Sequence, residues 1–178
     1  MRLRSAVLGA SVMLVLFAMP AVLRADDKAD RTKAVKEALA AFEAKDPSLA
    51  EAIAQAPGYA MFPTVGKGGL GIGGAHGSGQ VVEKGAPVGE TSLTQVTVGL
   101  QLGGQSYSEL ILFENAKVLA DFKQGNFKFS AQVSAVAITS GASKNAKFQN
   151  GVKVLTLAKG GLMYEASVGG QKFSYKAY

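Results

Sequence analysis

The chain has 178 residues, of which 48% are hydrophobic and 22 are glycine, and it contains no cysteine and no tryptophan. This length is enough for one domain with a substantial apolar core. Without cysteine the chain can form no disulfide bond, use no thiol in catalysis and carry no cysteine-linked lipid. Lys and Arg number 19 against 13 Asp and Glu, which gives a formal net charge of +6.

Residues 1–25 have the features of a secretory signal peptide. Arg2 and Arg4 form a basic start, residues 6–17 are apolar, and the small residue Ala25 precedes the first acidic residues. We therefore expect cleavage after Ala25 and a periplasmic or secreted protein, peripherally associated with a membrane, that consists of residues 26–178 as one domain. An uncleaved anchor is the alternative, because residues 5–23 contain 19 uncharged positions, about enough to cross a bilayer.

The charge of the expected exported chain is asymmetric. Three of the 19 basic residues lie in the leader, which leaves 16 against 13 acidic residues and a net charge of +3. From Lys117 onward there are nine lysines against only Asp121 and Glu165. This asymmetry favours an anionic partner, either lipid headgroups or nucleic acid, and an exported location argues against nucleic acid. A lysine-rich surface that only keeps the protein soluble is the other interpretation.

Two helices are expected at the start of this domain. Residues 27–45 predict the first, because Val35, Leu39 and Phe42 recur at helical spacing on one apolar stripe. Basic residues continue that stripe towards the N-terminus, which suits either a helix docked on a sheet or a helix lying in a membrane interface. A shorter helix is expected to begin either at Asp46-Pro47 or at Ser48, which has Glu51 three residues on as a capping box.

Glycine dominates residues 58–79, where it occupies nine positions. In a strand, the alternation of Gly69, Gly71 and Gly73 with apolar residues leaves one face nearly bare. Repeated glycine weakens a strand, so it indicates close approach of another backbone or a sharp bend of the sheet. We interpret these glycines, with Gly99 and Gly103 further on, as structural positions of a curved antiparallel sheet.

A nucleotide site is a second interpretation of the same glycines. Residues 69–74 match G-x-G-x-x-G, a pattern that binds phosphates only where a helix opens directly on the glycines. Residues 80–84 (QVVEK) are too short and too β-branched to be that helix, and Gly68 stands where a phosphate loop needs Ser or Thr. The sequence therefore disfavours nucleotide binding.

The remaining pattern is mostly that of short strands joined by glycine turns. Strands are expected at residues 61–65, 70–75, 79–83, 94–102, 107–113, 127–137, 152–158, 162–168 and 173–175. Turns are expected at residues 75–78 and at Gly103-Gly104, and a short helix is expected at residues 115–123 with its apolar side inward. Apolar residues on both faces of 110–113 indicate a strand covered on both sides. The predicted fold is α+β, with an antiparallel, curved or barrel-like β-sheet, two N-terminal helices and one short helix between strands.

Residue types that support catalysis are scarce. His76 is the single histidine of the chain, it lies among glycines, and no motif of a hydrolase or metalloprotease is present. Glu109, Glu114 and Asp121 are close in sequence, but a carboxylate pair requires the fold to bring them together. We therefore expect a protein that is not an enzyme and has no metal or cofactor.

Three blocks of the sequence carry a family resemblance. Residues 58–79 (GYAMFPTVGKGGLGIGGAHGSG), 97–113 (TVGLQLGGQSYSELILF) and 161–171 (GLMYEASVGGQ), in this order, closely resemble the SYLF-domain family, and the resemblance covers residues 29–178. Members of that family bind phospholipids, and fungal members also bind actin filaments. The resemblance implies phospholipid binding here and supplies no catalytic residues. Actin regulation is not expected of a chain that has an export leader.

The expected function is therefore that of a non-catalytic module that recognises anionic phospholipid at a membrane surface. The candidate contacts are basic residues of the first helix and of the glycine-rich segment: Lys28, Arg31, Lys33, Lys36 and Lys67. An envelope structural protein that binds a protein partner through its sheet is the alternative, and an unrecognised enzyme is a third.

Overall fold

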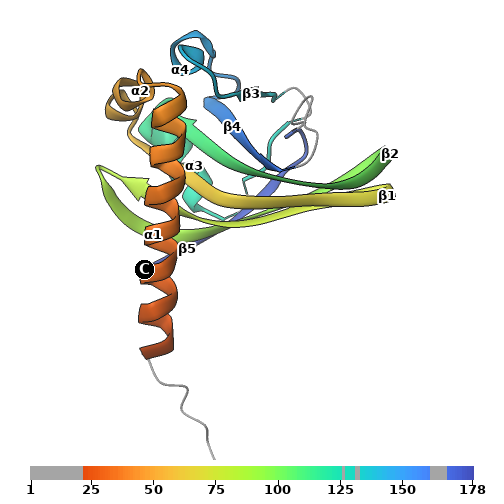
Figure 1. Cartoon of the computed structure of the whole chain (residues 1–178). Helices are drawn as coiled ribbons and strands as arrows, with labels where there is room; N and C mark the ends of the chain where they lie inside the picture. Colours follow the sequence, from red (N-terminus) through yellow and green to blue (C-terminus); the bar gives the residue numbers. More distant parts are fainter. Residues whose placement is uncertain (1–21, 126, 131–132, 161–167) are drawn as a thin grey trace, which may run out of the picture.

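The computed structural model describes residues 22–125, 127–130, 133–160 and 168–178, and has an α+β fold (Figure 1). Its elements in chain order are α1 Val22–Lys45, α2 Leu49–Gln55, β1 Gly58–Glu83, β2 Ala86–Phe113, α3 Ala116–Lys123, β3 Ala135–Ala137, α4 Ala142–Asn145, β4 Val152–Gly160 and β5 Lys172–Ala177. The strands form an open, curved sheet in the order β1-β2-β4-β3, and β5 pairs with another part of β2. The predicted fold class is confirmed, with one unexpected feature, the parallel pairing of β3 with β4.

β1 and β2 form one long antiparallel ribbon. The pairing runs from Tyr59↔Leu112 to Glu83↔Ala86, and the strands are joined by a tight turn. Lys84 and Gly85 make this turn with φ values of 52° and 78°. Two consecutive residues with positive φ are what a two-residue hairpin requires, because such a turn matches the twist of the strands.

The expected division of this region into short strands is wrong. Gly103 and Gly104, predicted as a turn, pair with Gly69 and Gly68 inside the ribbon, and residues 75–78 lie within β1. Alternation of apolar and polar residues shows that a segment is extended, but glycine is compatible with both a turn and an extended strand. Here pairing with a distant part of the chain keeps the glycines in the strand, and no local sequence pattern indicates that pairing.

Sharp curvature folds the ribbon back over itself. Between the pairs Leu70↔Leu102 and Ile72↔Val98, one residue of β1 faces three of β2. Such a bulge bends both strands, and in Figure 1 the two strands reach this bend as an arm beside the rest of the sheet. The two halves of the ribbon then approach closely at its base: a Cβ on Gly79 would clash with the carbonyl oxygen of Met61.

β2 organises the rest of the sheet because different parts of it have different neighbours. Residues 106–113 pair with β4, and residues 89–94 pair with β5. The predicted long strand at residues 127–137 is wrong, since among the described residues of this range only Ala135–Ala137 forms a strand. Phe127 and Phe129 instead turn their rings towards Phe173 of β5, so their alternation reflects packing of a loop into the core.

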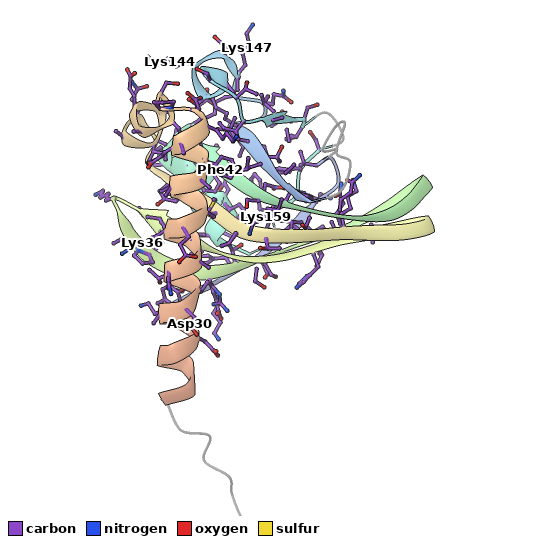
Figure 2. The ribbon with its side chains drawn as sticks, in the orientation of Figure 1. Asp30, Lys36, Phe42, Lys144, Lys147 and Lys159 are labelled. Atoms are coloured by element: carbon purple, nitrogen blue, oxygen red, sulfur yellow. The ribbon has the colours of Figure 1, made fainter. Side chains whose placement is uncertain are left out.

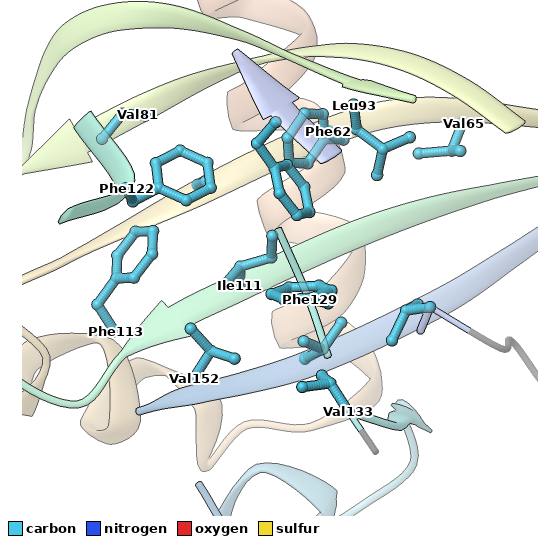
Figure 3. Packing of buried hydrophobic residues seen from close by; sticks show 14 of the residues in the cluster. Phe62, Val65, Val81, Leu93, Ile111, Phe113, Phe122, Phe129, Val133 and Val152 are labelled. Carbon is cyan, nitrogen blue, oxygen red and sulfur yellow. The ribbon is translucent and has the colours of Figure 1, made fainter. Parts of the chain in front are cut away.

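Two apolar clusters lie on the two faces of the sheet. The inner core fills the space enclosed by the folded ribbon and is rich in aromatic rings (Figure 3); it includes Phe62, Leu93, Tyr107, Ile111, Phe113, Phe122, Phe129 and Phe173. The helix-side core lies between the other face and the helices, and it includes Val35, Phe42, Leu49, Met61, Leu110, Leu112 and Leu155. Residues 110–113 therefore alternate between the two cores, which confirms the prediction that this strand is covered on both sides.

The helices cover the outer face, except for α3. Val35, Ala38 and Phe42 of α1 are buried, so this helix docks on the sheet as one of the two interpretations predicted. α3 forms where expected, is capped by the side chain of Asn115, and buries Leu119 and Phe122 in the inner core. The predicted capping box of α2 is wrong: Ser48 precedes the helix without capping it.

Candidate functional site

The surface around the first half of α1 carries most of the predicted site residues. This half of the helix extends beyond the apolar stripe and crosses the part of the ribbon next to β5 (Figure 1). Several hollows line its sides, and Arg31 contributes to three of them. The contacts here are polar, unlike those of the second half of the helix. This arrangement makes the region the candidate site.

A groove between α1 and the start of β2 contains three of the predicted basic residues. We call it the lysine groove; its volume is about 660 Å³ and its lining residues are Lys28, Ala29, Thr32, Lys33, Lys36, Glu37 and Pro87. Lys33 and Lys36 are exposed, and within the described part of the chain neither forms an ion pair. The groove thus presents three ammonium groups against one carboxylate.

Arg31 is placed differently from these lysines. It lies one helical turn before Val35 on the docked stripe, and its guanidinium is 2.6 Å from the carboxylate of Glu90 on β2. Lys176 of β5 contacts the other oxygen of the same carboxylate at 3.2 Å. The hydrogen bonds from Arg31 and Lys176 hold the pKa of Glu90 below its ordinary value. Arg31 therefore fastens the helix to the sheet.

The C-terminal residue contributes to the same attachment. The ammonium of Lys28 lies 4.0 Å from the centre of the Tyr178 ring, a cation–π contact. Gln80 of β1 donates to the Tyr178 hydroxyl at 2.6 Å and to the hydroxyl of Thr32 at 2.8 Å. Three distant segments of the sequence, the helix, β1 and the end of the chain, therefore meet at this point.

Small hydroxyl side chains line the sheet next to Arg31. Ser78, Ser92 and Ser174 are neighbours across β1, β2 and β5, and the last two hydroxyls are 2.6 Å apart. A hollow of about 330 Å³ lies over them, bounded by Arg31. His76 is exposed on the same ribbon, where it lines another hollow together with Asp30, Thr64 and Ser78. The surface therefore offers several groups that can form hydrogen bonds.

The last predicted contact, Lys67, lies away from this surface. It occupies the arm of the ribbon opposite Gln105, and burial lowers its pKa. Of the predicted structural glycines, Gly69 pairs with Gly103 near the bend, and Gly73 pairs with Thr97. Gly71 and Gly99 lie at the bulge between the pairs Leu70↔Leu102 and Ile72↔Val98. Close backbone approach at a glycine is observed at Gly79, at the base of the ribbon.

Sequence reasoning missed a buried polar cluster that joins α1 and α2 to α4. The carboxylate of Asp46 is completely buried and accepts hydrogen bonds from the backbone N–H groups of Ser48, Gly141 and Ser143 and from the Ser48 hydroxyl. Burial alone would raise the pKa of Asp46, but these bonds together hold it far below its ordinary value. Lys153 donates to the Ser143 carbonyl at 2.7 Å. The Asp-Pro pair of the sequence indicated only a helix start.

A second buried carboxyl lies in the inner core. Glu109 is completely buried and accepts a 3.0 Å hydrogen bond from the side chain of Gln171. Glu114 is exposed, and Asp121 pairs with Lys117 on α3, so these three acids form no carboxylate pair. One signal did mark Glu109: it shares a strand face with three residues of the inner core, Tyr107, Ile111 and Phe113.

Within residues 22–125, 127–130, 133–160 and 168–178, no three His, Cys, Asp or Glu side chains are grouped so that they could hold a metal ion. Of the helices in these ranges, none is both long enough and apolar enough to cross a membrane.

Comparison with known proteins agrees with the resemblance seen in the sequence. Residues 94–177 match a family model described as "Ysc84: Las17-binding protein actin regulator", the SYLF family. This segment runs from the middle of β2 to the end of β5, and therefore includes Glu109, Gln171 and Lys176 but none of α1. No curated protein matches the chain.

Proposed function

Because residues 94–177 belong to the SYLF family, we propose that this chain is an exported, non-catalytic module that binds anionic phospholipid headgroups at a membrane surface. The lysine groove carries this proposal. Its ammonium groups outnumber its carboxylates by three to one, and Lys33 and Lys36 are exposed and free of ion pairs within the described residues. A phosphate that lies over the groove would lie beside ammonium groups that form no ion pair within the described residues.

The attraction is local and does not extend along the whole helix. Between Asp26 and Lys45 the sequence has five basic and five acidic residues, so this part of the helix has no net charge. Arg31 and Lys176 both contact the carboxylate of Glu90, which neutralises part of their positive charge. Recognition in this proposal therefore depends on Lys28, Lys33 and Lys36, with the lysines after Lys117 adding a general attraction to an anionic surface.

Vesicle sedimentation with matched variants tests the proposal. Changing Lys28, Lys33 and Lys36 together to Gln should weaken binding to anionic vesicles by up to about 3 kcal/mol, since each lysine near such a surface contributes about 1 kcal/mol. The control changes the exposed Lys117, Lys144 and Lys147 to Gln, which removes the same charge elsewhere; Figure 2 shows Lys144 and Lys147 above Lys36, beyond the other end of the helix. The control should lose clearly less affinity.

Two results would contradict the proposal. Equal losses in both triple variants would mean that only net charge matters and that the groove recognises nothing. Failure of the unaltered protein to sediment with either anionic or neutral vesicles at low salt would end the lipid interpretation.

The sheet edge supports a second candidate, binding of a protein segment. β3 pairs with β4 only at residues 154–156, so within the described residues no strand covers that edge of β4 at residues 157–160. An extended peptide can add to such an edge through main-chain hydrogen bonds. Lys159 turns its ammonium back to the Pro63 carbonyl at 2.9 Å, so its charge does not protect the edge from pairing. Protein binding becomes the favoured function if the unaltered protein does not bind vesicles.

A further inference from the structure

Two buried side chains of the inner core are each only half satisfied. Glu109 and Gln171 are both 0% exposed. The Gln171 amide Nε2 donates to Glu109 Oε2 at 3.0 Å, and its distance to the Tyr107 hydroxyl is 3.5 Å. Within the described residues, Glu109 Oε1 and Gln171 Oε1 have no hydrogen-bond partner. A buried acceptor without a donor is costly, so this pairing of two unsatisfied oxygens requires an explanation.

Protonation of the carboxyl group satisfies both oxygens at once. Two acceptor oxygens cannot bond to each other, but a carboxylic acid has an O–H donor that a carboxylate lacks. A primary amide and a carboxylic acid pair through two antiparallel bonds, from N–H to the acid oxygen and from O–H to the amide oxygen. The first bond is present here, and the two unsatisfied atoms are the ones that the second bond joins.

We propose that Glu109 is a neutral carboxylic acid in the folded protein, joined to Gln171 by a two-bond acid–amide pair, and that its ionisation loosens the attachment of residues 168–178 to β2. The surroundings of Glu109 favour the neutral form. Its neighbours across the sheet are Phe62 on β1 and Thr156 on β4, neither of which is charged. Within the described residues, no Lys, Arg or His bonds to it.

Tyr107 is a titratable group beside this pair, and it supplies no countercharge. Tyr107 is 1% exposed, and burial raises its pKa further above the ordinary value, so it remains a neutral phenol. Burial likewise raises the pKa of Glu109 to about 7, although the Gln171 hydrogen bond acts in the opposite direction. A modest change of pH around neutrality is therefore enough to remove the proton of Glu109.

Gln171 fixes the start of the last strand. Its backbone carbonyl accepts from Phe129 N–H at 2.9 Å, and its own N–H donates to Val168 at 3.1 Å. The next residue begins β5, which pairs with β2 and carries Lys176. Ionisation of Glu109 would break the acid–amide bond and leave a charged carboxylate buried beside Gln171. Local opening of residues 168–178 would let that carboxylate reach water.

Carbon-13 NMR of labelled glutamate and hydrogen exchange test the proposal on the unaltered chain. The Glu109 carboxyl carbon should titrate near pH 7. Protection factors of amides in residues 169–176 should fall about a hundredfold between pH 5 and pH 8, because the open state releases the proton at an ordinary pKa. A carboxylate signal for Glu109 at pH 5 would overturn the proposal without any variant.

Substitution of Glu109 by glutamine removes the ionisable proton and keeps a side chain of similar size and shape. Glu109→Gln keeps one donor and one acceptor towards Gln171 but cannot ionise, so protection of residues 169–176 should become independent of pH. The exposed Glu114→Gln is the control and should retain the dependence of the unaltered protein. If Glu109→Gln also retains it, the switch lies elsewhere and the proposal is wrong. These readouts need no lipid, so they stand or fall separately from the proposed function.

Discussion

The guanidinium of Arg31 lies 2.6 Å from the carboxylate of Glu90, although 59 residues separate them in sequence. This ion pair lies one helical turn before Val35, where the apolar stripe of α1 ends and polar contacts take over. The first half of the helix is therefore attached by ion pairs and hydrogen bonds at the protein surface, and the second half by the helix-side core. The basic residues of the helix consequently have two different roles.

Arg31→Gln should loosen the helix and have little effect on membrane binding. The pair with Glu90 is partly exposed, so its loss should cost no more than about 1 kcal/mol. Hydrogen exchange of amides 27–34 should accelerate, and vesicle affinity should change less than in Lys33→Gln, the matched control. Loss of vesicle binding in Arg31→Gln with unchanged exchange would instead make Arg31 a direct lipid contact.

Global stability should decline as pH rises from about 5 to 7 because of Glu109. Its pKa is raised from 4.5 to about 7 in the folded protein, so its contribution is complete below the unfolded value and is lost as pH rises through the folded value. The total is on the order of 3 kcal/mol at about 1.4 kcal/mol per unit. Urea unfolding at several pH values measures it, and Glu109→Gln should flatten the curve over this interval. An unchanged slope in the variant would refute the assignment.

Asp46 should have the opposite dependence. Its pKa is lowered in the folded protein, so its contribution is present above the ordinary value of 3.8 and is lost on further acidification. Asp46→Asn places an amide N–H among donors and should cost about 1–3 kcal/mol in urea unfolding. Asp27→Asn, an exposed residue of α1, is the control and should change stability little. Equal midpoints for the two variants would mean that the cluster contributes nothing to stability.

A methyl group at Gly79 should destabilise the ribbon, because its Cβ would overlap the Met61 carbonyl. Overpacking of this kind costs about 1–3 kcal/mol. Gly66→Ala provides a control in the same strand, since no atom lies within 4 Å of the position of its Cβ. Thermal unfolding of both variants should show a lower melting temperature only for Gly79→Ala. A similar decrease at both positions would attribute the effect to strand flexibility and not to backbone contact.

The sequence by itself determined the kind of elements and several of their faces. Helical spacing of Val35 and Phe42 predicted the docked stripe of α1, and residues 110–113 predicted a strand between two cores. Both are local patterns, in which each residue's position on its own element decides whether it is buried. Composition also limited the possible catalytic chemistry, because the sequence has no cysteine to act as a thiol and only one histidine.

Tertiary structure decided which distant segments pair and how burial changes the properties of their side chains. Gly103-Gly104 has the composition of a turn, yet pairing with Gly68 and Gly69 keeps it inside a continuous ribbon. Glu109 is an ordinary acid in the sequence, and burial inside a core that excludes water gives it an unusual proton affinity, although the hydrogen bond from Gln171, 62 residues away, acts in the opposite direction. Such energies depend on desolvation and on partners brought together by folding, so no local pattern encodes them.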